Sequence, residues 1–213
     1  MKLYGYWRSS TSYRVRAALN LKKLDYEYVP VNIAKGEQFG SSYSAINPGA
    51  GVPSLVLADG TTLVQSLVIL DYLEAMWPDP GLVPIDPVER ANVMAVAHIV
   101  ALDIHPLNNL RVMGQLQNRF GANQQDCTDW MHHWMSFGFQ AAEKMIAPDT
   151  GFAFGKAPCI ADLCIVTQMY NARRWKLDVG RFPRLTRVEK LCLEIPEIAA
   201  AHPDRQPDAQ EVT

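Results

Sequence analysis

A run of four hydroxyl side chains lies between an apolar opening segment and a stretch with helical spacing: Ser9, Ser10, Thr11 and Ser12. A helix N-terminus offers unpaired backbone N–H groups and the positive end of the helix dipole. Hydroxyls there can cap the helix, or they can donate hydrogen bonds to an anion. Arg8 and two later arginines add positive charge, which favours a thiolate. The run therefore predicts either a plain cap or a site that activates a thiol cofactor.

Two further segments of the first third of the chain could hold a ligand. If the Val52–Pro53 bond is cis, the turn exposes the backbone N–H and C=O of Val52 to an extended ligand; a trans proline on an edge strand is the commoner alternative. Gln65 and Ser66 lie where a predicted strand meets a predicted helix. A backbone N–H and a hydroxyl could hold a carboxylate there, and the alternative is that Ser66 is a simple N-cap.

Polar residues also interrupt two later apolar helices. His105, Asn108 and Asn109 have i, i+3, i+4 spacing, so on one helix they share a face, and Pro106 among them predicts a bend. This face could line a cleft, satisfy its own polar groups or meet a dimer partner. Arg174 follows a mostly apolar segment and could be a surface arginine whose stem covers apolar residues.

Composition sets limits on the class of protein. The chain has 213 residues, 48% of them hydrophobic, and a formal charge of −2. This is enough for a core, excludes disorder and gives no global field for nucleic acid or an anionic membrane. The longest apolar run, residues 93–102, contains His98, and we expect it to be too short to cross a bilayer. No long apolar run begins the chain, so no signal peptide is expected.

The cysteines predict neither a disulfide framework nor a metal site. No two of them have Cys-x-x-Cys or metal-ligand spacing, and His132 and His133 are adjacent, so their rings diverge on a helix. We expect reduced, buried thiols in a cytoplasmic protein and no bound metal. The four are Cys127, Cys159, Cys164 and Cys192.

Residues 1–77 alternate between strand and helix signals. The predicted order is β-α-β-(loop or short helix)-β-β-α, with Asp59-Gly60 as a hairpin turn. A crossover followed by a hairpin implies a mixed sheet covered by helices, which is an α/β domain. The predicted strands are 2–6, 26–33, 53–57 and 62–64, and the predicted helices are 13–21 and 67–76.

Four prolines in residues 78–87 predict a linker, after which strand signals largely vanish. The second domain is therefore predicted to be an all-α helical bundle, and the polar tail from His202 is expected to run over the surface. The predicted domains are 1–80 and 88–213. The predicted helices of the second domain are 88–114, 126–146, 160–175 and 184–193.

Taken together, the three candidate sites of the first domain resemble the thioredoxin-like, glutathione-binding domain of the glutathione transferases. The resemblance covers nearly the whole chain and narrows to the zeta class, which includes maleylacetoacetate and maleylpyruvate isomerases. The segments that carry it are Arg8-Ser-Ser-Thr-Ser-Tyr-Arg-Val-Arg16, Asp103-Ile-His-Pro-Leu-Asn-Asn109, Asn171-Ala-Arg-Arg-Trp175 and His202-Pro-Asp-Arg-Gln-Pro-Asp208.

The resemblance implies a homodimeric enzyme that uses glutathione to isomerise a small dicarboxylate, a maleyl keto acid, in aromatic catabolism. It implies that Ser9, Ser10 or Thr11 stabilises the glutathione thiolate, and that Arg8 and Arg174, with Arg111 as a weaker candidate, bind substrate carboxylates. A conjugating or dehalogenating transferase and a non-catalytic binding protein are the alternatives. The implied glutathione contacts are Ser9, Ser10, Thr11, Ser12, Gln38, Val52, Pro53, Gln65, Ser66, His105, Asn108 and Asn109.

Two residues depart from the pattern of the zeta class. Thr11 stands where this class usually has cysteine, and bacterial maleylpyruvate isomerases look similar in this respect, which favours maleylpyruvate as substrate. Cys159 stands where transferases begin a helix with Ser or Thr, with Asp162 at the third helical position. We expect a weaker cap there, costing up to about 1 kcal/mol, or a backbone substitute. We interpret the basic residues Arg14, Arg16, Lys22 and Lys23 as a solvated face, and Trp130 and Trp134 as packing residues.

Overall fold

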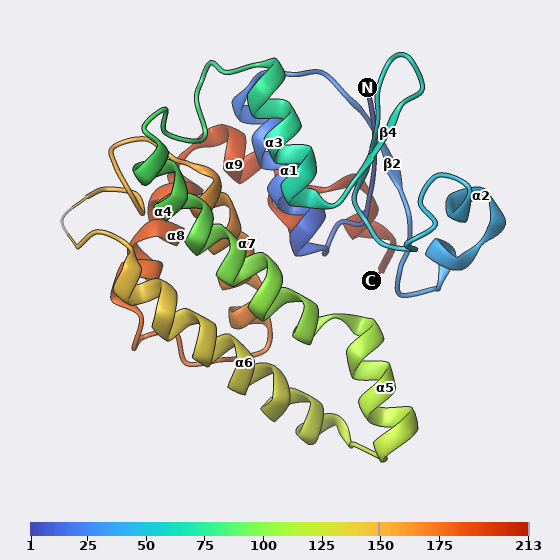
Figure 1. Cartoon of the computed structure of the whole chain (residues 1–213). Helices are drawn as coiled ribbons and strands as arrows, with labels where there is room; N and C mark the ends of the chain where they lie inside the picture. The colour runs from blue at the N-terminus through green and yellow to red at the C-terminus, as the bar shows by residue number, and fades with distance from the viewer. Residues whose placement is uncertain (149, 213) are drawn as a thin grey trace. The chain divides into compact units, whose positions relative to one another are not determined.

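The computed structural model describes residues 1–148 and 150–212. Its contacts divide the chain into two compact units. One contains residues 1–81 and the segment from Glu194 onward, and the other contains residues 82–193 (Figure 1). The predicted domains were 1–80 and 88–213. The main difference is that the segment from Glu194 onward belongs to the first unit and not to the second. That segment joins the first unit because helix α9 (Pro196–Ala200) packs against α1 (Ser10–Leu21).

A mixed four-stranded sheet forms the centre of the first unit, as the sequence predicts. The strand order is β2-β1-β3-β4, in which β1 is parallel to β2 and antiparallel to β3, and β3 is antiparallel to β4. The hairpin at Asp59-Gly60 is confirmed: Gly60 has a φ of +89°, and Asp59 Oδ1 accepts a hydrogen bond from the Thr61 N–H at 2.9 Å. The strands are β1 (Lys2–Gly5), β2 (Glu27–Pro30), β3 (Ser54–Val56) and β4 (Thr62–Val64).

Helix α1 packs against both α3 and α9, and the three lie side by side in Figure 1. The prediction of α1 began three residues late, because Ser10, Thr11 and Ser12 already belong to the helix. Helix α9 was not predicted because it is only five residues long; it begins at Pro196, a residue that is common at the first helical position. The other helical elements of this unit are α2 (Ser41–Ser44), α3 (Ser66–Met76) and 3₁₀ segments at Glu37–Phe39, Pro203–Arg205 and Pro207–Val212.

The prediction that the basic run is a solvated face is wrong. The side chains of Arg14 and Arg16 are fully buried, and Lys22 is buried as well, so only Lys23 of the four is exposed. Lys22 Nζ donates to Glu74 Oε2 and to the Pro80 carbonyl oxygen, each at 2.9 Å. Burial of these cations is tolerated because each one finds oxygen acceptors inside the unit.

The tail from His202 is also not a loose surface segment. Its polar residues Gln206 and Asp208 are buried, as is Pro203. Gln206 Nε2 donates to the carbonyl oxygens of Ala200 and His202, both at 3.0 Å. A polar, proline-rich sequence looks like surface, yet here its polar groups are paired inside the fold.

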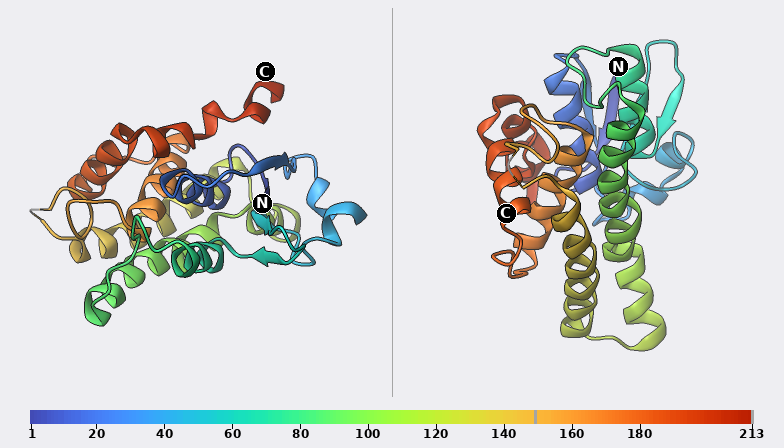
Figure 2. Two further views of the ribbon diagram at one scale, coloured as in Figure 1. Left: turned by 90° about the horizontal axis from the view of Figure 1, so that it is seen from above. Right: turned by 60° about the vertical axis from the view of Figure 1, so that its left-hand side comes forward.

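The second unit is a helical bundle, in agreement with the sequence. Its helices α5 and α6 lie side by side and are joined by a short loop (Figure 2). Trp130 and Trp134 pack edge to face with ring centroids 5.7 Å apart, as their i, i+4 spacing predicts. The helices are α4 (Pro87–His98), α5 (Leu110–Phe120), α6 (Gln124–Met145), α7 (Ile160–Arg174) and α8 (Pro183–Glu194).

The predicted single helix 88–114 is wrong, because α4 and α5 are separate α-helices. A π-helical segment, Ile99–Ile104, and a 3₁₀ segment, His105–Asn108, connect them. Pro106 has no N–H to continue an α-helix, so the predicted bend at this position becomes a change of helix type. The helical path Pro87–Phe120 is longer than the predicted apolar run 93–102, and by length and composition alone it could cross a membrane. Helices of globular proteins can share this length and composition, so neither property assigns the path to a membrane.

The N-terminus of α7 shows what replaces the usual hydroxyl cap. The Asp162 carboxylate accepts hydrogen bonds from the backbone N–H of Cys159 at 2.8 Å and of Ala153 at 2.7 Å. The Cys159 thiol donates to the same carboxylate at 2.9 Å. Burial raises the pKa of Asp162 and, with the adjacent carboxylate, raises the pKa of the Cys159 thiol well above its ordinary value. The four cysteines are buried and free of disulfides.

Candidate functional site

Ser9 is the N-cap of α1 and organises the hydroxyl run. Its backbone is extended, its Oγ accepts a hydrogen bond from the Ser12 N–H at 3.2 Å, and its own N–H donates to the Tyr6 carbonyl oxygen at 3.0 Å. No acidic residue lies in the first turn of α1. The positive end of this helix is therefore not neutralised by a carboxylate of its own first turn, which suits an anionic ligand.

The hydroxyl protons of the turn can be assigned from its hydrogen bonds. Thr11 Oγ1 donates its single proton to the Val52 carbonyl oxygen at 2.8 Å. Ser9 Oγ lies 2.8 Å from Thr11 Oγ1, so Ser9 is the donor in this contact. If an anion approaches, Ser9 can turn its proton toward it while keeping its capping role, whereas Thr11 must first release Val52. Ser9 is the hydroxyl of this pair that is ready to donate.

The other two hydroxyls of the run are Ser10 and Ser12. Ser10 is buried to nearly the same extent as Ser9, with 6% against 8% of its surface exposed, and Ser12 is completely buried. Ser12 Oγ accepts a hydrogen bond from the Tyr6 N–H at 3.4 Å, so it fastens α1 to the end of β1. The expectation that Ser12 contacts glutathione does not fit this position.

The Val52–Pro53 bond is cis, so the commoner trans alternative is excluded. The preceding loop is held by two side chains, those of Tyr43 and Asn47, that were not predicted as site residues. The Tyr43 hydroxyl donates to the Gly51 carbonyl oxygen at 2.5 Å, and Asn47 Nδ2 donates to the same oxygen at 2.7 Å. An Asn-Pro-Gly turn is the only signal in the sequence that marked Asn47 as a structural residue.

The second candidate anion site is the N-terminus of α3. Ser66 is the first residue of the helix, so the prediction that it is the N-cap is wrong; Gln65 occupies that position with a φ of 71° and makes no side-chain cap. Positive φ is unusual for a residue with a side chain and occurs often at functional sites. Ser66 Oγ accepts a hydrogen bond from Arg14 Nη1 at 3.3 Å.

Arg14 places a buried positive charge directly behind Ser66. Its side chain is completely buried, and its Nε and Nη2 atoms have no hydrogen-bond partner among the described residues. A buried guanidinium needs negative charge or acceptors to offset its lost hydration. Because Arg14 already donates to Ser66, the Ser66 proton is free for another acceptor, and α3 has no acid in its first turn. This end of α3 therefore suits a carboxylate.

Gln38 is the remaining predicted glutathione contact in the first unit. It lies in the 3₁₀ segment Glu37–Phe39 and is largely buried. Its Oε1 atom is buried and has no hydrogen-bond partner among the described residues.

The three predicted contacts in the second unit do not share one helical face. His105 and Asn108 both belong to the 3₁₀ segment, where residues three apart are eclipsed. Asn109 has extended backbone and is the N-cap of α5, with its Oδ1 accepting from the Arg111 N–H at 3.1 Å. Both polar atoms of the Asn108 amide are buried with no hydrogen-bond partner in the described part of the chain.

The candidate substrate arginines are stacked on neighbouring tryptophans. The guanidinium carbon of Arg8 lies 5.1 Å from the centre of the Trp7 ring, and that of Arg174 lies 4.8 Å from the centre of the Trp175 ring. Such contacts hold a guanidinium in place beside the ring. Arg8 belongs to the first unit; Arg174 and the exposed Arg111 belong to the second.

The histidine pair on α6 diverges as expected. His132 Nε2 lies 2.6 Å from the Trp175 carbonyl oxygen, whereas the His133 ring packs edge-on against Trp134. Within residues 1–148 and 150–212, no group of three or more potential metal ligands occurs.

Comparisons with known proteins place these sites in a family. Residues 8–76 match the model of the glutathione S-transferase N-terminal domain, a range that spans the first-unit sites. The maleylacetoacetate isomerase of Pseudomonas aeruginosa is 42% identical over 210 residues, which is 98% of both chains. A holo structure of maleylpyruvate isomerase, a bacterial zeta-class glutathione S-transferase, is 40% identical, with a TM-score of 0.95 over 98% of this chain and 99% of that one.

The chain belongs to the zeta class of glutathione transferases.

A further zeta-type structure bears on ligand chemistry. Maleylacetoacetate isomerase from Anaeromyxobacter dehalogenans, 40% identical with a TM-score of 0.87, covers 98% of this chain and 93% of its own. That structure contains dicarboxyethyl glutathione and citrate in its active site. The family therefore includes a member that accepts both the tripeptide and carboxylate-rich groups.

Proposed function

We propose that this zeta-class chain is a glutathione-dependent cis–trans isomerase of a maleyl keto acid, with maleylpyruvate favoured over maleylacetoacetate. The observation that carries the proposal is the N-terminus of α1. It presents a Ser9 hydroxyl that can redirect its proton, and it lacks a carboxylate in its first turn. The names of the relatives and the ligands of their structures support the same reaction.

Glutathione is the cofactor, and its sulfur is the reacting atom. A free thiol of this kind has a pKa of about 8.5, so little thiolate exists at neutral pH. Hydrogen bonding from Ser9 and the dipole of α1 stabilise the thiolate and lower the pKa of the bound thiol. Thr11 keeps the backbone of Val52 in place through its own hydrogen bond.

The thiolate adds to the cis double bond of the substrate. A C–S bond forms, and the displaced electron pair moves through the conjugated system to the carbonyl oxygen, giving an enolate. The former double bond is now single and rotates. The electron pair then returns, the C–S bond breaks, and glutathione leaves as the thiolate beside a trans, fumaryl product. No proton or electron is gained or lost overall.

Arg8 and Arg174 are the proposed contacts of the two substrate carboxylates, through forked hydrogen bonds, and Arg111 is a weaker third candidate. Arginine near the carbonyl also stabilises the enolate charge that develops during the reaction. Replacing Arg8 or Arg174 by Ala should raise KM sharply, and an unchanged KM would remove that residue from substrate binding.

The other predicted contacts hold glutathione itself. The backbone of Val52 before Pro53 pairs with its cysteinyl group, and Gln65 with Ser66 holds its γ-glutamyl carboxylate, with the Arg14 charge behind. Gln38 is a further contact in the first unit. His105, Asn108 and Asn109 are proposed contacts in the second unit. We also propose that the protein is a cytoplasmic homodimer.

The direct test supplies maleylpyruvate to the purified protein with and without glutathione and follows fumarylpyruvate. Conversion should require glutathione and leave its concentration unchanged. Equal conversion without glutathione would contradict the mechanism. Consumption of glutathione with a chloroacid or a chloroaromatic, and no isomerisation, would show a conjugating transferase instead.

A further inference from the structure

We propose that Arg16 and Asp208 are positioning residues that fix the hydroxyl turn through the backbone of Trp7. This inference rests on the proposed function, since it concerns the residue that precedes Arg8 and Ser9. Asp208 contacts Trp7 across a separation of 201 residues in the sequence, within the same compact unit.

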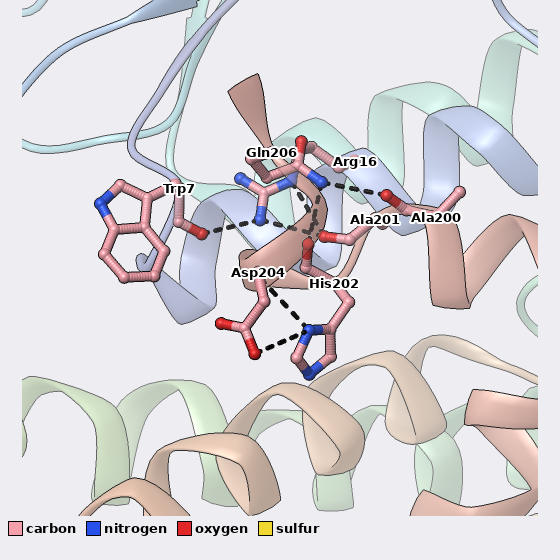
Figure 3. A network of polar contacts seen from close by, with 7 residues as sticks. All are labelled: Trp7, Arg16, Ala200, Ala201, His202, Asp204 and Gln206. Carbon is pink, nitrogen blue, oxygen red and sulfur yellow. Dashed lines mark hydrogen bonds and ion pairs between the residues drawn. The ribbon is translucent and has the colours of Figure 1, made fainter. Parts of the chain in front are cut away.

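Arg16 binds the turn from one side and the C-terminal segment from the other (Figure 3). Its Nη2 donates to the Trp7 carbonyl oxygen at 3.0 Å, and its Nη1 donates to the Tyr6 carbonyl oxygen at 3.4 Å. Its Nε and Nη2 both donate to the Ala201 carbonyl oxygen at 3.1 Å. Burial lowers the pKa of the Arg16 guanidinium, but arginine stays charged in proteins, so these are charge-assisted hydrogen bonds.

Asp208 holds the backbone N–H of the same residue, Trp7. Its Oδ2 accepts a hydrogen bond from the Trp7 N–H at 2.9 Å and from the Tyr28 hydroxyl at 3.2 Å. The side chain is buried, so water does not compete for these bonds. Trp7 is therefore fixed at its N–H by an anion and at its carbonyl by a cation, immediately before the candidate substrate arginine and the N-cap serine.

The segment that delivers Asp208 is itself well fixed. Gln206 Nε2 donates to the carbonyl oxygens of Ala200 and His202, which flank the Ala201 carbonyl oxygen held by Arg16 (Figure 3). Asp208 can therefore act as a rigid support rather than as a mobile side chain. A shift of Trp7 would move Ser9 relative to the sulfur, and small misplacements of a catalytic donor are costly.

The test compares three variants in the full chain. Asp208→Ala removes both hydrogen bonds, and Asp208→Asn keeps a carbonyl oxygen that can still accept from the Trp7 N–H. Asp204→Ala is the matched control, because Asp204 lies in the same segment, is exposed and pairs with His202 at 3.7 Å. For each we would measure thermal unfolding, the pKa of the bound glutathione thiol from thiolate absorbance, and kcat and KM for maleylpyruvate.

We expect Asp208→Ala to raise the pKa of the bound thiol and to lower kcat about tenfold, with a smaller change in KM. Asp208→Asn should recover most of the loss, and Asp204→Ala should match the wild type. A folded Asp208→Ala protein with wild-type thiol pKa and kcat would overturn the proposal, as would equal impairment of the Ala and Asn variants. If Asp208→Ala does not fold, Asp208→Asn decides alone: we expect a raised thiol pKa and a loss of kcat smaller than about tenfold, because a neutral amide accepts more weakly than a carboxylate, and wild-type values of both would overturn the proposal.

The wild type separates this inference from the proposed function. If it binds glutathione as a thiolate but does not convert maleylpyruvate, only the isomerase function is contradicted. The thiol pKa of the variants then still decides the positioning role of Asp208.

Discussion

The N-termini of α1 and α7 both carry the positive end of a helix dipole, but only α7 has a carboxylate of its own in the first turn. At α7, the chain fills the positive end with its own carboxylate: Asp162 accepts from two backbone N–H groups and from the Cys159 thiol. At α1, no acid lies in the first turn, and Ser9 caps the helix with a hydroxyl. One terminus is closed by an internal anion, and the other can receive an anion from outside.

This difference also bears on the protonation expected of a sulfur atom at each helix N-terminus. The Cys159 thiol lies beside a carboxylate in a buried site, and both effects raise its pKa. A glutathione sulfur at α1 would instead meet a hydroxyl donor, a helix dipole and Arg8. The comparison indicates that α1 differs from α7 in having no carboxylate of its own in the first helical turn, which suits an external anion.

Removing the anion that closes α7 should have the largest effect. Asp162→Ala leaves the N–H groups of Ala153 and Cys159 without an acceptor, and unsatisfied buried donors cost about 1–3 kcal/mol each. We expect a loss of about 3 kcal/mol in the free energy of unfolding by denaturant titration. Asp126→Ala, in the exposed capping box of α6, is the control and should cost about 1 kcal/mol. Equal losses for the two variants would contradict the special role of the buried site.

Removing the donor at the open terminus should mainly affect catalysis. Ser9→Ala should lower kcat about 100-fold, the size expected for one preorganised donor to a developing or bound charge. It should cost only about 1 kcal/mol of stability, as for an N-cap. Thr11→Val should have a smaller effect on kcat, because the Thr11 proton is held by Val52. A larger effect for Thr11→Val would reverse the assignment of the donor.

The N-terminus of α3 also has no acidic residue in its first turn. A change there should alter the affinity for glutathione. Arg14→Met keeps much of the side-chain volume and removes the charge behind Ser66. We expect the Kd for glutathione to rise about tenfold, or about 1.4 kcal/mol, by calorimetric titration. The exposed Lys23 on the same stretch of chain is the control, and Lys23→Met should leave Kd unchanged. An unchanged Kd for Arg14→Met would show that this charge serves the fold alone.

The smallest effect should come from restoring a hydroxyl at the closed terminus. Cys159→Ser places a better hydrogen-bonding group beside Asp162, and we expect stability to increase by up to about 1 kcal/mol. Chemical denaturation measures the change. A loss of stability would mean that the thiol fits its buried site better than a hydroxyl does.

Local signals in the sequence predicted the elements that position the site. Each of these signals lies within a few residues of the helix start or turn that it predicts. They are the hydroxyl run, the Asp59-Gly60 turn and the Gln65-Ser66 junction. The mixed sheet and the helical bundle followed from the order of these signals. The break at Pro106 was predicted as a bend, but a π-helical segment before it has no comparable local signal.

Long-range contacts were not predictable in this way. Arg14 and Arg16 look like surface residues because charge is normally exposed, and only their partners at Ser66 and Ala201 make burial tolerable. The same is true of Asp208, whose partners Trp7 and Tyr28 come from the opposite end of the chain. The pattern of a single sequence indicates periodicity and helix caps. The burial of these charged residues depends instead on hydrogen-bond partners that are distant in the sequence and close only in the folded chain.

The most direct test of the account is a pH titration of the thiolate absorbance of glutathione bound to the wild-type protein. The account predicts a thiol pKa well below the value of about 8.5 for a free thiol of this kind, and a return toward that value in Ser9→Ala. A bound thiol that titrates like free glutathione in the wild type would contradict it.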